Sequence, residues 1–314
     1  MAKILINDGI HPAGLERLKS HGFEVETQNI PQEELAEKLP AYDAICVRSA
    51  TKVRAVLIDQ CPNLKVIGRG GVGLDNIDVE YARSKNIHVI NTPAASSRSV
   101  AELSFGHLSG LARFLHKANI HMPKTGVDEF KALKKSYSKG FELKGKTIGI
   151  IGLGRIGVEA VKIALGYEMN VIGVDPFIDS KTIDVNYAGQ SFKYDIPISS
   201  MEEMLSQADI ISLHVPFTGN AVLGEAEFSQ MKKGVIIINA ARGGVVNEDA
   251  LLFALDNDIV AAAGLDVFEN EPKPRLELLQ HPNVSVTPHI GASTGEAQEK
   301  IGLELADQLI ELLS

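Results

Sequence analysis

The sequence predicts an α/β protein built on doubly wound parallel sheets, and two observations carry this prediction. Short apolar runs, such as residues 44–47, 147–151 and 235–239, recur along the whole chain. Between most of these runs lie segments whose apolar residues are spaced as on one face of a helix. Strands that alternate with helices favour a parallel sheet covered on both faces. At roughly 150 residues per domain, the 314 residues suggest two domains.

The elements expected in the N-terminal part follow from these runs. Strands are expected at residues 3–6, 23–27, 44–47, 65–67 and 88–90, and helices at 12–20 and 33–39. The longest helical segment runs from Ser99 to about His121, with apolar residues at helical spacing. It is followed by a polar, lysine-rich stretch, Lys124 to Lys139, which is either a loop or an arm onto a partner subunit.

A second alternating series begins at Lys146. Its strands are expected at residues 147–151, 170–174, 210–213, 235–239, 261–265 and 284–287, with helices between most of them. The last helix is expected from about Gly295 to Leu312.

Composition and charge exclude several classes of protein. The net charge of −9 argues against a general nucleic-acid or anionic-membrane surface. No apolar stretch reaches the roughly 18 residues of a membrane span, and the apolar run after Met1 is too short for a signal peptide. Cys46 and Cys61 are too few for a disulfide framework or a structural zinc site. We therefore expect buried thiols, no metal and a cytoplasmic location.

Residues 146–157 have the pattern of a strand, a glycine turn and the start of a helix. The turn Gly152-Leu153-Gly154-Arg155-Ile156-Gly157 has the spacing of a dinucleotide-binding motif, and the flanking elements supply the context that a chance match lacks. Gly152 permits the tight turn, Gly154 lets the backbone approach a pyrophosphate, and Gly157 lets the helix pack closely. The pyrophosphate is then bound at the helix N-terminus.

The next expected strand ends at Asp175, about 20 residues beyond the glycines. An acidic residue at this distance accepts hydrogen bonds from the adenosine ribose and repels a 2′-phosphate. Pro176 and Phe177 follow, with no arginine beside them. The sequence therefore predicts NAD, rather than NADP, as the cofactor.

Three chemically suited residues follow strands of the second series. Ligands of an open parallel sheet bind outside the carboxyl ends of its strands, where Arg242, Glu271 and His289 are expected. Arg242 can hold a carboxylate and polarise a carbonyl. His289 can exchange a proton near neutral pH, and Glu271 can orient the imidazole. Taken singly, these could be a structural histidine and a surface ion pair, but together they predict hydride exchange between NAD and a 2-hydroxy acid.

Four ordered motifs resemble those of the D-isomer-specific 2-hydroxyacid dehydrogenases. They are the glycine turn with Asp175, residues 239–244, residues 264–268 with Glu271-Pro272, and residues 287–294. The resemblance covers nearly the whole chain and implies Arg242 and Glu271 as catalytic residues and His289 as proton donor. In that family the C-terminal helix completes the N-terminal domain. This implies a flavodoxin-like substrate domain, residues 1–97 plus 288–314, into which a Rossmann NAD domain, residues 98–287, is inserted.

The expected cofactor site combines the turn, the strand ends and the contacts that the resemblance implies. His214 follows a strand and is expected to have a structural role on the cofactor side. The resemblance also implies a homodimer or higher homo-oligomer that pairs through the NAD domain, with residues 100–115 and the lysine-rich arm as the candidate interface. The expected cofactor-binding residues are Gly152, Gly154, Arg155, Ile156, Gly157, Asp175, His214, Val215, Pro216, Ala240, Ala241, Asp266, Gly291 and Ala292.

Two arginines after strands of the first series indicate a substrate with a second anionic group. Arg48 and Arg69 offer charge beyond that of Arg242, as a phosphorylated hydroxy acid requires. Both strand ends are expected to face the interdomain cleft, and the glycine run at 68–73 offers N–H groups for a carboxylate. Alternatively, the two arginines form surface ion pairs. The expected substrate-binding residues are Arg48, Ser49, Arg69, Gly71, Val72 and Gly73.

Residues 47–53, 68–78 and 91–93 resemble the phosphoglycerate dehydrogenase branch of the family. This resemblance implies NAD-linked oxidation of 3-phospho-D-glycerate to 3-phosphohydroxypyruvate, the first step of serine biosynthesis, with Arg48 and Arg69 on the phosphate. Many members of this branch carry a C-terminal regulatory domain, and the sequence is expected to be a short form without it. The alternatives are another D-2-hydroxyacid dehydrogenase, such as a hydroxypyruvate or glyoxylate reductase, and, more remotely, an NAD-sensing corepressor-like binding protein.

Overall fold

The computed structural model describes residues 1–186 and 188–314. The chain divides into two compact units, Met1–Ser99 with Ala292–Ser314 and Val100–Gly291. The boundaries expected after residues 97 and 287 lie a few residues before these. None of the described helices combines the length and the apolar composition of a membrane span.

The first unit contains a five-stranded parallel sheet in the order β2-β1-β3-β4-β5. This is the flavodoxin-like order. Its strands are β1 (Lys3–Ile6), β2 (Glu24–Glu26), β3 (Ala44–Val47), β4 (Val66–Arg69) and β5 (His88–Asn91). Its helices are α1 (Pro12–Ser20), α2 (Leu35–Lys38), α3 (Ala55–Ile58), α4 (Val79–Ser84), α13 (Gly295–Leu313) and the 3₁₀ helix η1 (Leu39–Ala41).

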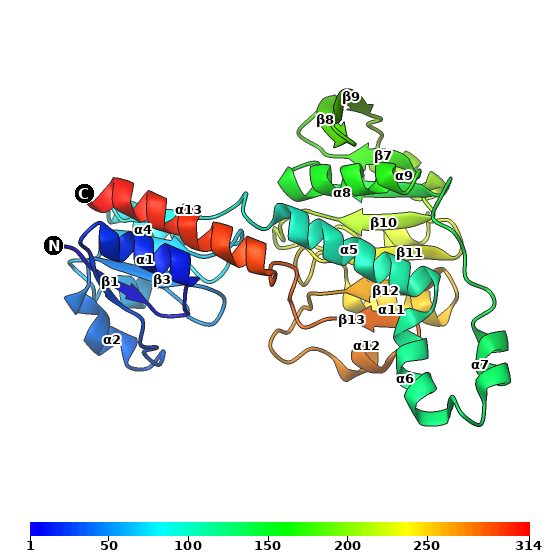
Figure 1. Cartoon of the computed structure of the whole chain (residues 1–314), viewed down its shortest axis with the longest axis horizontal. Coiled ribbons are helices and arrows are strands. Elements are labelled where there is room, and N and C mark those ends of the chain that lie inside the picture. The colour runs from blue at the N-terminus through cyan, green and yellow to red at the C-terminus, as the bar shows by residue number, and fades with distance from the viewer. The chain divides into compact units, whose positions relative to one another are not determined.

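The C-terminal helix α13 completes the core of this N-terminal unit. Side chains of a strand alternate between its two faces, so Ile4 and Ile6 pack in the core that contains Leu305 of α13, whereas Leu5 lies in the core on the other face. Helix α13 lies alongside α1 (Figure 1). A Cβ atom on Gly14 of α1 would lie 2.4 Å from the carbonyl oxygen of Gly302. The close helix pair therefore requires glycine in α1.

The second unit contains a six-stranded parallel sheet in the order β13-β12-β11-β10-β6-β7, together with an antiparallel hairpin, β8-β9. The strands are β6 (Thr147–Ile151), β7 (Asn170–Val174), β8 (Lys181–Tyr187), β9 (Gln190–Ile196), β10 (Ile210–Leu213), β11 (Val235–Asn239), β12 (Val260–Leu265) and β13 (Val284–Val286). The helices are α5 (Ser97–Ala112), which begins in the first unit, α6 (Leu115–Thr125), α7 (Phe130–Ser136), α8 (Arg155–Gly166), α9 (Met201–Gln207), α10 (Glu225–Phe228), α11 (Glu248–Asp256) and α12 (Leu276–Gln280).

The second sheet has the strand arrangement of a Rossmann fold, except that its outermost strand beside β7 is not fully formed. A single parallel bridge between Gly173 and Ile198 takes the place of that strand. The strand order reverses between β6 and β10. In an open α/β sheet, ligands bind at this switch point, outside the carboxyl ends of the strands. A ligand site is therefore expected beside Ile151 and Leu213, the last residues of the two strands.

Helices cover both faces of this sheet, as the alternation of its apolar strands requires. On β11, Ile236 and Ile238 pack in one core, whereas Val235 and Ile237 pack in the other. Helices α5 and α8 supply the first core, and α9, α10, α11 and α12 supply the second. The doubly wound fold predicted from the sequence is confirmed.

Three local features differ from the expectation. The helix expected from Ser99 to His121 breaks into α5 and α6, because Phe114 adopts a left-handed backbone with φ 57°. Part of the lysine-rich stretch is helical and forms α7. Residues 181–196 form the β8-β9 hairpin, whose two-residue turn, Ala188-Gly189, has φ values of 49° and 80°. Positive φ at both positions is the requirement of a type I′ turn.

Candidate active site

The glycine turn follows β6 and leads into α8. Gly152 has φ 89°, a conformation that a residue with a side chain rarely adopts. A Cβ atom on Gly157 would lie 1.9 Å from the carbonyl oxygen of Gly152, so the helix could not approach the turn with any other residue there. A Cβ on Gly154 would meet nothing within 4 Å. The turn is therefore tight on its inner side and open at Gly154, as a bound pyrophosphate requires.

Asp175, directly after β7, is fixed against this turn. Its carboxylate accepts hydrogen bonds from the backbone N–H of Leu153, at 2.9 Å, and of Phe177, at 3.0 Å. The side chain is half-buried, and each oxygen retains acceptor capacity for a further donor. A negative charge is thus held beside the turn, where the ribose hydroxyls of a dinucleotide would be bound.

The loop after β10 lies on the inner side of the glycine turn. A Cβ on Gly152 would lie 2.6 Å from Val215 and 2.7 Å from the carbonyl oxygen of His214. The ring Nε2 of His214 is 3.0 Å from the Ser212 hydroxyl, and its Nδ1 is shielded from solvent. Burial lowers the pKa of His214 to about 4. The ring is therefore uncharged at neutral pH, which suits a structural role better than proton transfer.

Arg242 lies in a braced loop after β11. The Asn239 side chain accepts from the N–H of Ala241 and donates to the carbonyl of Arg242, both at 3.0 Å. The guanidinium donates to the carbonyl of Ala241 at 2.6 Å. A Cβ on Gly243 would lie 1.8 Å from the carbonyl oxygen of Phe268, so this loop packs directly on the loop after β12. The brace by Asn239 was not predicted, although a polar residue that ends the apolar run 235–239 is the signal for it.

Glu271 and His289 form a hydrogen-bonded pair. His289 Nδ1 and Glu271 Oε2 are 2.7 Å apart, and Glu271 Oε1 accepts from the N–H of Phe268 at 3.0 Å. Burial alone would raise the pKa of Glu271, but the hydrogen bond and charge of His289, with the charge of Arg242, hold it below its usual value. The structure thus brings together the three residues that the sequence singled out. Because Nδ1 is engaged, Nε2 of His289 is the nitrogen available to a substrate.

The backbone that carries His289 is held by Asp266. The N–H of His289 donates to the Asp266 carbonyl at 2.8 Å, and the Asp266 carboxylate accepts from the N–H of Ile290 and of Gly291, each at 2.8 Å. His289 itself has φ 54°. Asp266, expected as a cofactor contact, therefore also fixes the segment next to the imidazole.

The remaining expected cofactor residues lie near these loops or begin the last segment. Arg155 and Ile156 are the first residues of α8, and Pro216 lies in the loop after β10. Ala240 and Ala241 are buried beneath Arg242. Ala292 is the first residue of the C-terminal segment that belongs to the first unit.

The expected substrate residues gather at the carboxyl ends of β3 and β4. The N–H of Arg48 donates to the Asp8 carboxylate at 2.7 Å, and the Arg69 guanidinium lies 3.4 Å from the Ser49 hydroxyl. Gly71 has φ 144°, and a Cβ there would lie 1.9 Å from Nη1 of Arg69. The glycine run thus lets its backbone approach the Arg69 guanidinium closely. Two further members of the expected set, Val72 and Gly73, are half-buried in this run.

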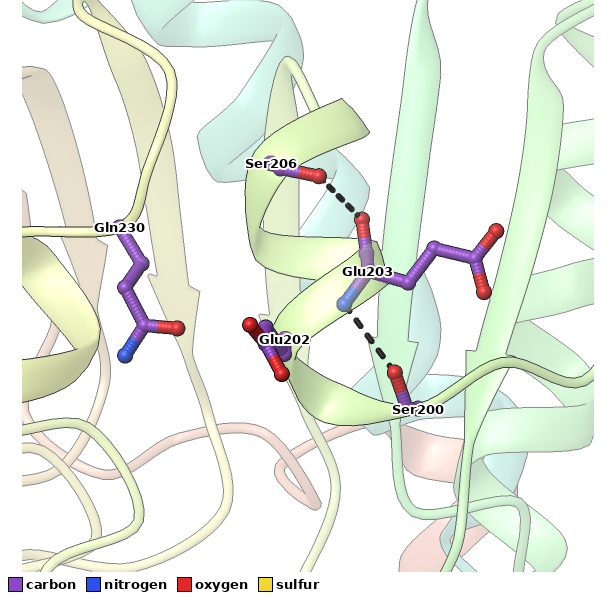
Figure 2. A pocket seen from close by; sticks show the side chains of 5 residues that line it. All are labelled: Ser200, Glu202, Glu203, Ser206 and Gln230. Atoms are coloured by element: carbon purple, nitrogen blue, oxygen red, sulfur yellow. Dashed lines mark hydrogen bonds between the residues drawn. The ribbon is translucent and has the colours of Figure 1, made fainter.

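A cavity of about 480 Å³ lies elsewhere, against α9. Figure 2 shows its lining, in which Ser200 caps the helix by accepting from the N–H of Glu203, and Ser206 donates to the Glu203 carbonyl. Glu202 and Gln230 complete it. The cavity is acidic, and none of the catalytic candidates lines it, so it does not suit an anionic substrate. Among the described residues no group of His, Cys, Asp and Glu is arranged to hold a metal ion.

Comparison with known proteins supports the reading of these motifs. Residues 105–291 match the family described as D-isomer specific 2-hydroxyacid dehydrogenase, NAD binding domain. The chain is 42% identical over 315 residues to a D-3-phosphoglycerate dehydrogenase of Methanocaldococcus jannaschii, covering 100% of this chain but 58% of that protein. It is 41% identical over 317 residues to a hydroxypyruvate reductase of Thermotoga maritima, covering 99% of this chain and 98% of that protein.

The fold also has solved counterparts. A glyoxylate reductase from Paecilomyes thermophila superposes with a TM-score of 0.81 at 29% identity, covering 99% of this chain and 95% of that one. The chain spans little more than half the length of the phosphoglycerate dehydrogenases it matches, but nearly all of the hydroxypyruvate reductase.

Proposed function

The chain belongs to the D-isomer-specific 2-hydroxyacid dehydrogenases, with an NAD-binding domain, and we propose that it oxidises 3-phospho-D-glycerate to 3-phosphohydroxypyruvate. The observation that supports this substrate is the cluster of Arg48, Ser49 and Arg69 with the glycine run in the first unit. Such an activity would serve the first step of serine biosynthesis.

The charge of the substrate decides between the candidates. A simple 2-hydroxy acid carries one carboxylate, for which Arg242 suffices. A phosphorylated acid adds a group with a charge of about −1.5 to −2, and planar guanidinium groups bind such a group with paired hydrogen bonds. We assign phosphate binding to Arg48 and Arg69 of the first unit, and carboxylate binding to Arg242 of the second.

Residues of the second unit would carry the proton chemistry. Bound NAD supplies the acceptor for the hydride that leaves C2 of the hydroxy acid. His289 takes the hydroxyl proton on Nε2, because Nδ1 is held by Glu271. Ionised Glu271 favours the imidazolium that results. Arg242 stabilises the carbonyl oxygen as it forms. In the reverse direction the imidazolium returns the proton.

The second candidate is a hydroxypyruvate reductase. The observation that favours it is the match to the Thermotoga maritima enzyme over 98% of that protein's length. This activity needs the same catalytic set and a substrate with no phosphate. A corepressor-like binding role has less support, because Arg242, Glu271 and His289 are all present in a geometry suited to turnover.

A substrate panel tests the proposal. NADH oxidation is followed with phosphohydroxypyruvate, hydroxypyruvate, glyoxylate and pyruvate, and phosphohydroxypyruvate is expected to give the highest kcat/KM. Arg48→Ala and Arg69→Ala should each raise its KM about 10- to 100-fold, the loss of one charge-assisted hydrogen bond, and leave hydroxypyruvate unaffected. Arg83→Ala, which removes an exposed arginine paired with Glu80, is the control. A higher kcat/KM with an unphosphorylated acid would refute the assignment.

We also propose that the chain forms a homodimer through α6 and the lysine-rich arm. The part of the expected interface in α5 is corrected, because Phe105, Leu108 and Leu111 are buried in the core of the second unit. Helix α6 has no buried residue, and its face exposes Leu115 and Ile120, each about half accessible. Phe130, at the start of α7, is 57% exposed. Apolar side chains grouped in this way commonly mark a protein interface.

A further inference from the structure

A line of hydrogen-bonding side chains runs from α5 to the backbone that carries His289. Nδ1 of His107 is 2.9 Å from the Ser285 hydroxyl, and Nε2 is 2.9 Å from the Thr287 hydroxyl. Thr287 in turn donates to Oδ1 of Asp266 at 2.6 Å. His107 and Thr287 were not among the residues that the sequence singled out.

The direction of each hydrogen bond follows from the last one. A carboxylate only accepts hydrogen bonds, so the Thr287 hydroxyl is the donor to Asp266. The same hydroxyl must therefore accept from Nε2 of His107, which fixes the proton of a neutral ring on that nitrogen. Nδ1 is left as an acceptor for Ser285. A neutral His107 can therefore satisfy the whole line only when it carries its proton on Nε2.

The surroundings of His107 favour this state. The residue is 5% exposed, and burial lowers its pKa although the charge of Asp266 opposes the shift. The base of the side chain packs closely on β12, since a Cβ on Gly264 would lie 2.6 Å from Cβ and 3.0 Å from Cγ of His107. The two ring nitrogens are in turn held by Ser285 and Thr287.

The line ends on atoms that determine where the catalytic imidazole lies. Asp266 is 1% exposed, and its carboxylate accepts from Thr287 and from the N–H groups of Ile290 and Gly291. These two residues directly follow His289, whose φ of 54° is unusual for a residue with a side chain. A turn of the carboxylate would move this backbone and, with it, the ring that meets Glu271.

We propose that His107 and Thr287 are positioning residues, which act through Asp266 to hold His289 in line with Glu271. Neither residue touches substrate or cofactor in this role. Thr287 fixes the rotation of the carboxylate, and His107 fixes the hydroxyl of Thr287.

The kinetic test rests on the proposed function and uses two substitutions of Thr287. Thr287→Val has the same shape but no hydroxyl, and kcat for the 2-oxo acid is expected to fall about 5- to 30-fold with KM unchanged, the effect of one lost hydrogen bond. Thr287→Ser keeps the hydroxyl and should restore kcat to within about twofold of wild type. His107→Leu should resemble Thr287→Val. Ser104→Ala, which removes a buried hydroxyl of α5 that donates to the Val100 carbonyl, should have no effect.

Two measurements on the full chain do not require activity. ¹⁵N NMR should show His107 as the neutral Nε2-protonated tautomer. Amide hydrogen exchange at Ile290 and Gly291 should be faster in Thr287→Val and His107→Leu than in wild type, Thr287→Ser and Ser104→Ala. If wild type turns over no 2-oxo acid, the proposed function fails while these measurements still test the positioning role.

Three results would overturn the inference. The first is wild-type amide exchange in both Thr287→Val and His107→Leu, and the second is an Nδ1-protonated His107. The third is a loss of kcat in Thr287→Ser as large as in Thr287→Val, which would mean that the shape of the side chain matters and the hydroxyl does not.

Discussion

His214 should make the folded protein sensitive to mild acid. Although the residue is half-buried as a whole, its Nδ1 is shielded from solvent, and burial lowers the pKa of the ring from 6.5 to about 4. As the pH falls, the unfolded chain therefore protonates His214 near pH 6.5, whereas the folded chain protonates it only near pH 4. The free energy of unfolding therefore falls as the pH is lowered from about 6.5 to about 4. Below about pH 4 both states are protonated, and His214 causes no further change.

The magnitude follows from the two pKa values. At pH 5, protonation of His214 in the unfolded state lowers the free energy of unfolding by about 2 kcal/mol. At pH 7.5 the same effect is below about 0.1 kcal/mol. His214→Gln keeps a polar side chain that can still meet Ser212 but does not titrate. Between pH 7.5 and pH 5 the wild type should therefore lose about 2 kcal/mol more of its unfolding free energy than the variant does.

Urea unfolding at several pH values measures this difference. The chain has no tryptophan, so far-UV circular dichroism is the suitable probe. Ser104→Ala, which removes a buried hydroxyl and no titratable group, should leave the pH dependence of the wild type unchanged. Parallel curves for wild type and His214→Gln across this range would refute the argument, because they would show that the folded state protonates His214 as readily as the unfolded state does.

Three further outcomes are expected. Asp175→Asn removes the charge that repels a 2′-phosphate, so kcat/KM for NADPH relative to NADH should rise about tenfold; an unchanged ratio would contradict the role of Asp175 in cofactor choice. Glu271→Gln should lower kcat about 100-fold or more, by analogy with the orienting acid of a catalytic triad. Steady-state kinetics with the 2-oxo acid measure this, and an unchanged kcat would contradict the orienting role of Glu271. Ile120→Glu should convert a dimer into a monomer in sedimentation, and a monomeric wild type would exclude the proposed interface.

The sheets and the proximity of the three candidate catalytic residues could be predicted because both depend on short-range pattern and simple topology. Runs such as residues 148–151 and 235–238 are apolar throughout, which is typical of strands covered on both faces. Once the strands are parallel, their carboxyl ends meet at one edge. The proximity of Arg242, Glu271 and His289 then follows from their positions after three neighbouring strands.

The features that the sequence did not reveal depend on single backbone angles or on contacts between distant segments. The break at Phe114 is one left-handed residue inside an otherwise regular helical pattern. In the β8-β9 hairpin, Ile183 and Val185 alternate with exposed polar residues, a strand pattern that is weak where helices are expected on both sides. The hydrogen bonds from His107 to Ser285 and Thr287 join residues 178 and 180 positions apart, and no local pattern encodes them.

The conformation of His289 changes how substitutions at Asp266 should be interpreted. A left-handed backbone costs about 1–2 kcal/mol for a residue with a side chain, and this cost is met by the backbone bond to the Asp266 carbonyl and by the two N–H groups that its carboxylate accepts. Asp266→Asn would turn an amide N–H₂ toward the Thr287 hydroxyl or toward one of these N–H groups. A loss of activity in that variant would therefore arise even without any contact between Asp266 and NAD. Only cofactor affinity measured directly, with the amide exchange of Gly291 as a report on the loop, separates the two roles of the residue.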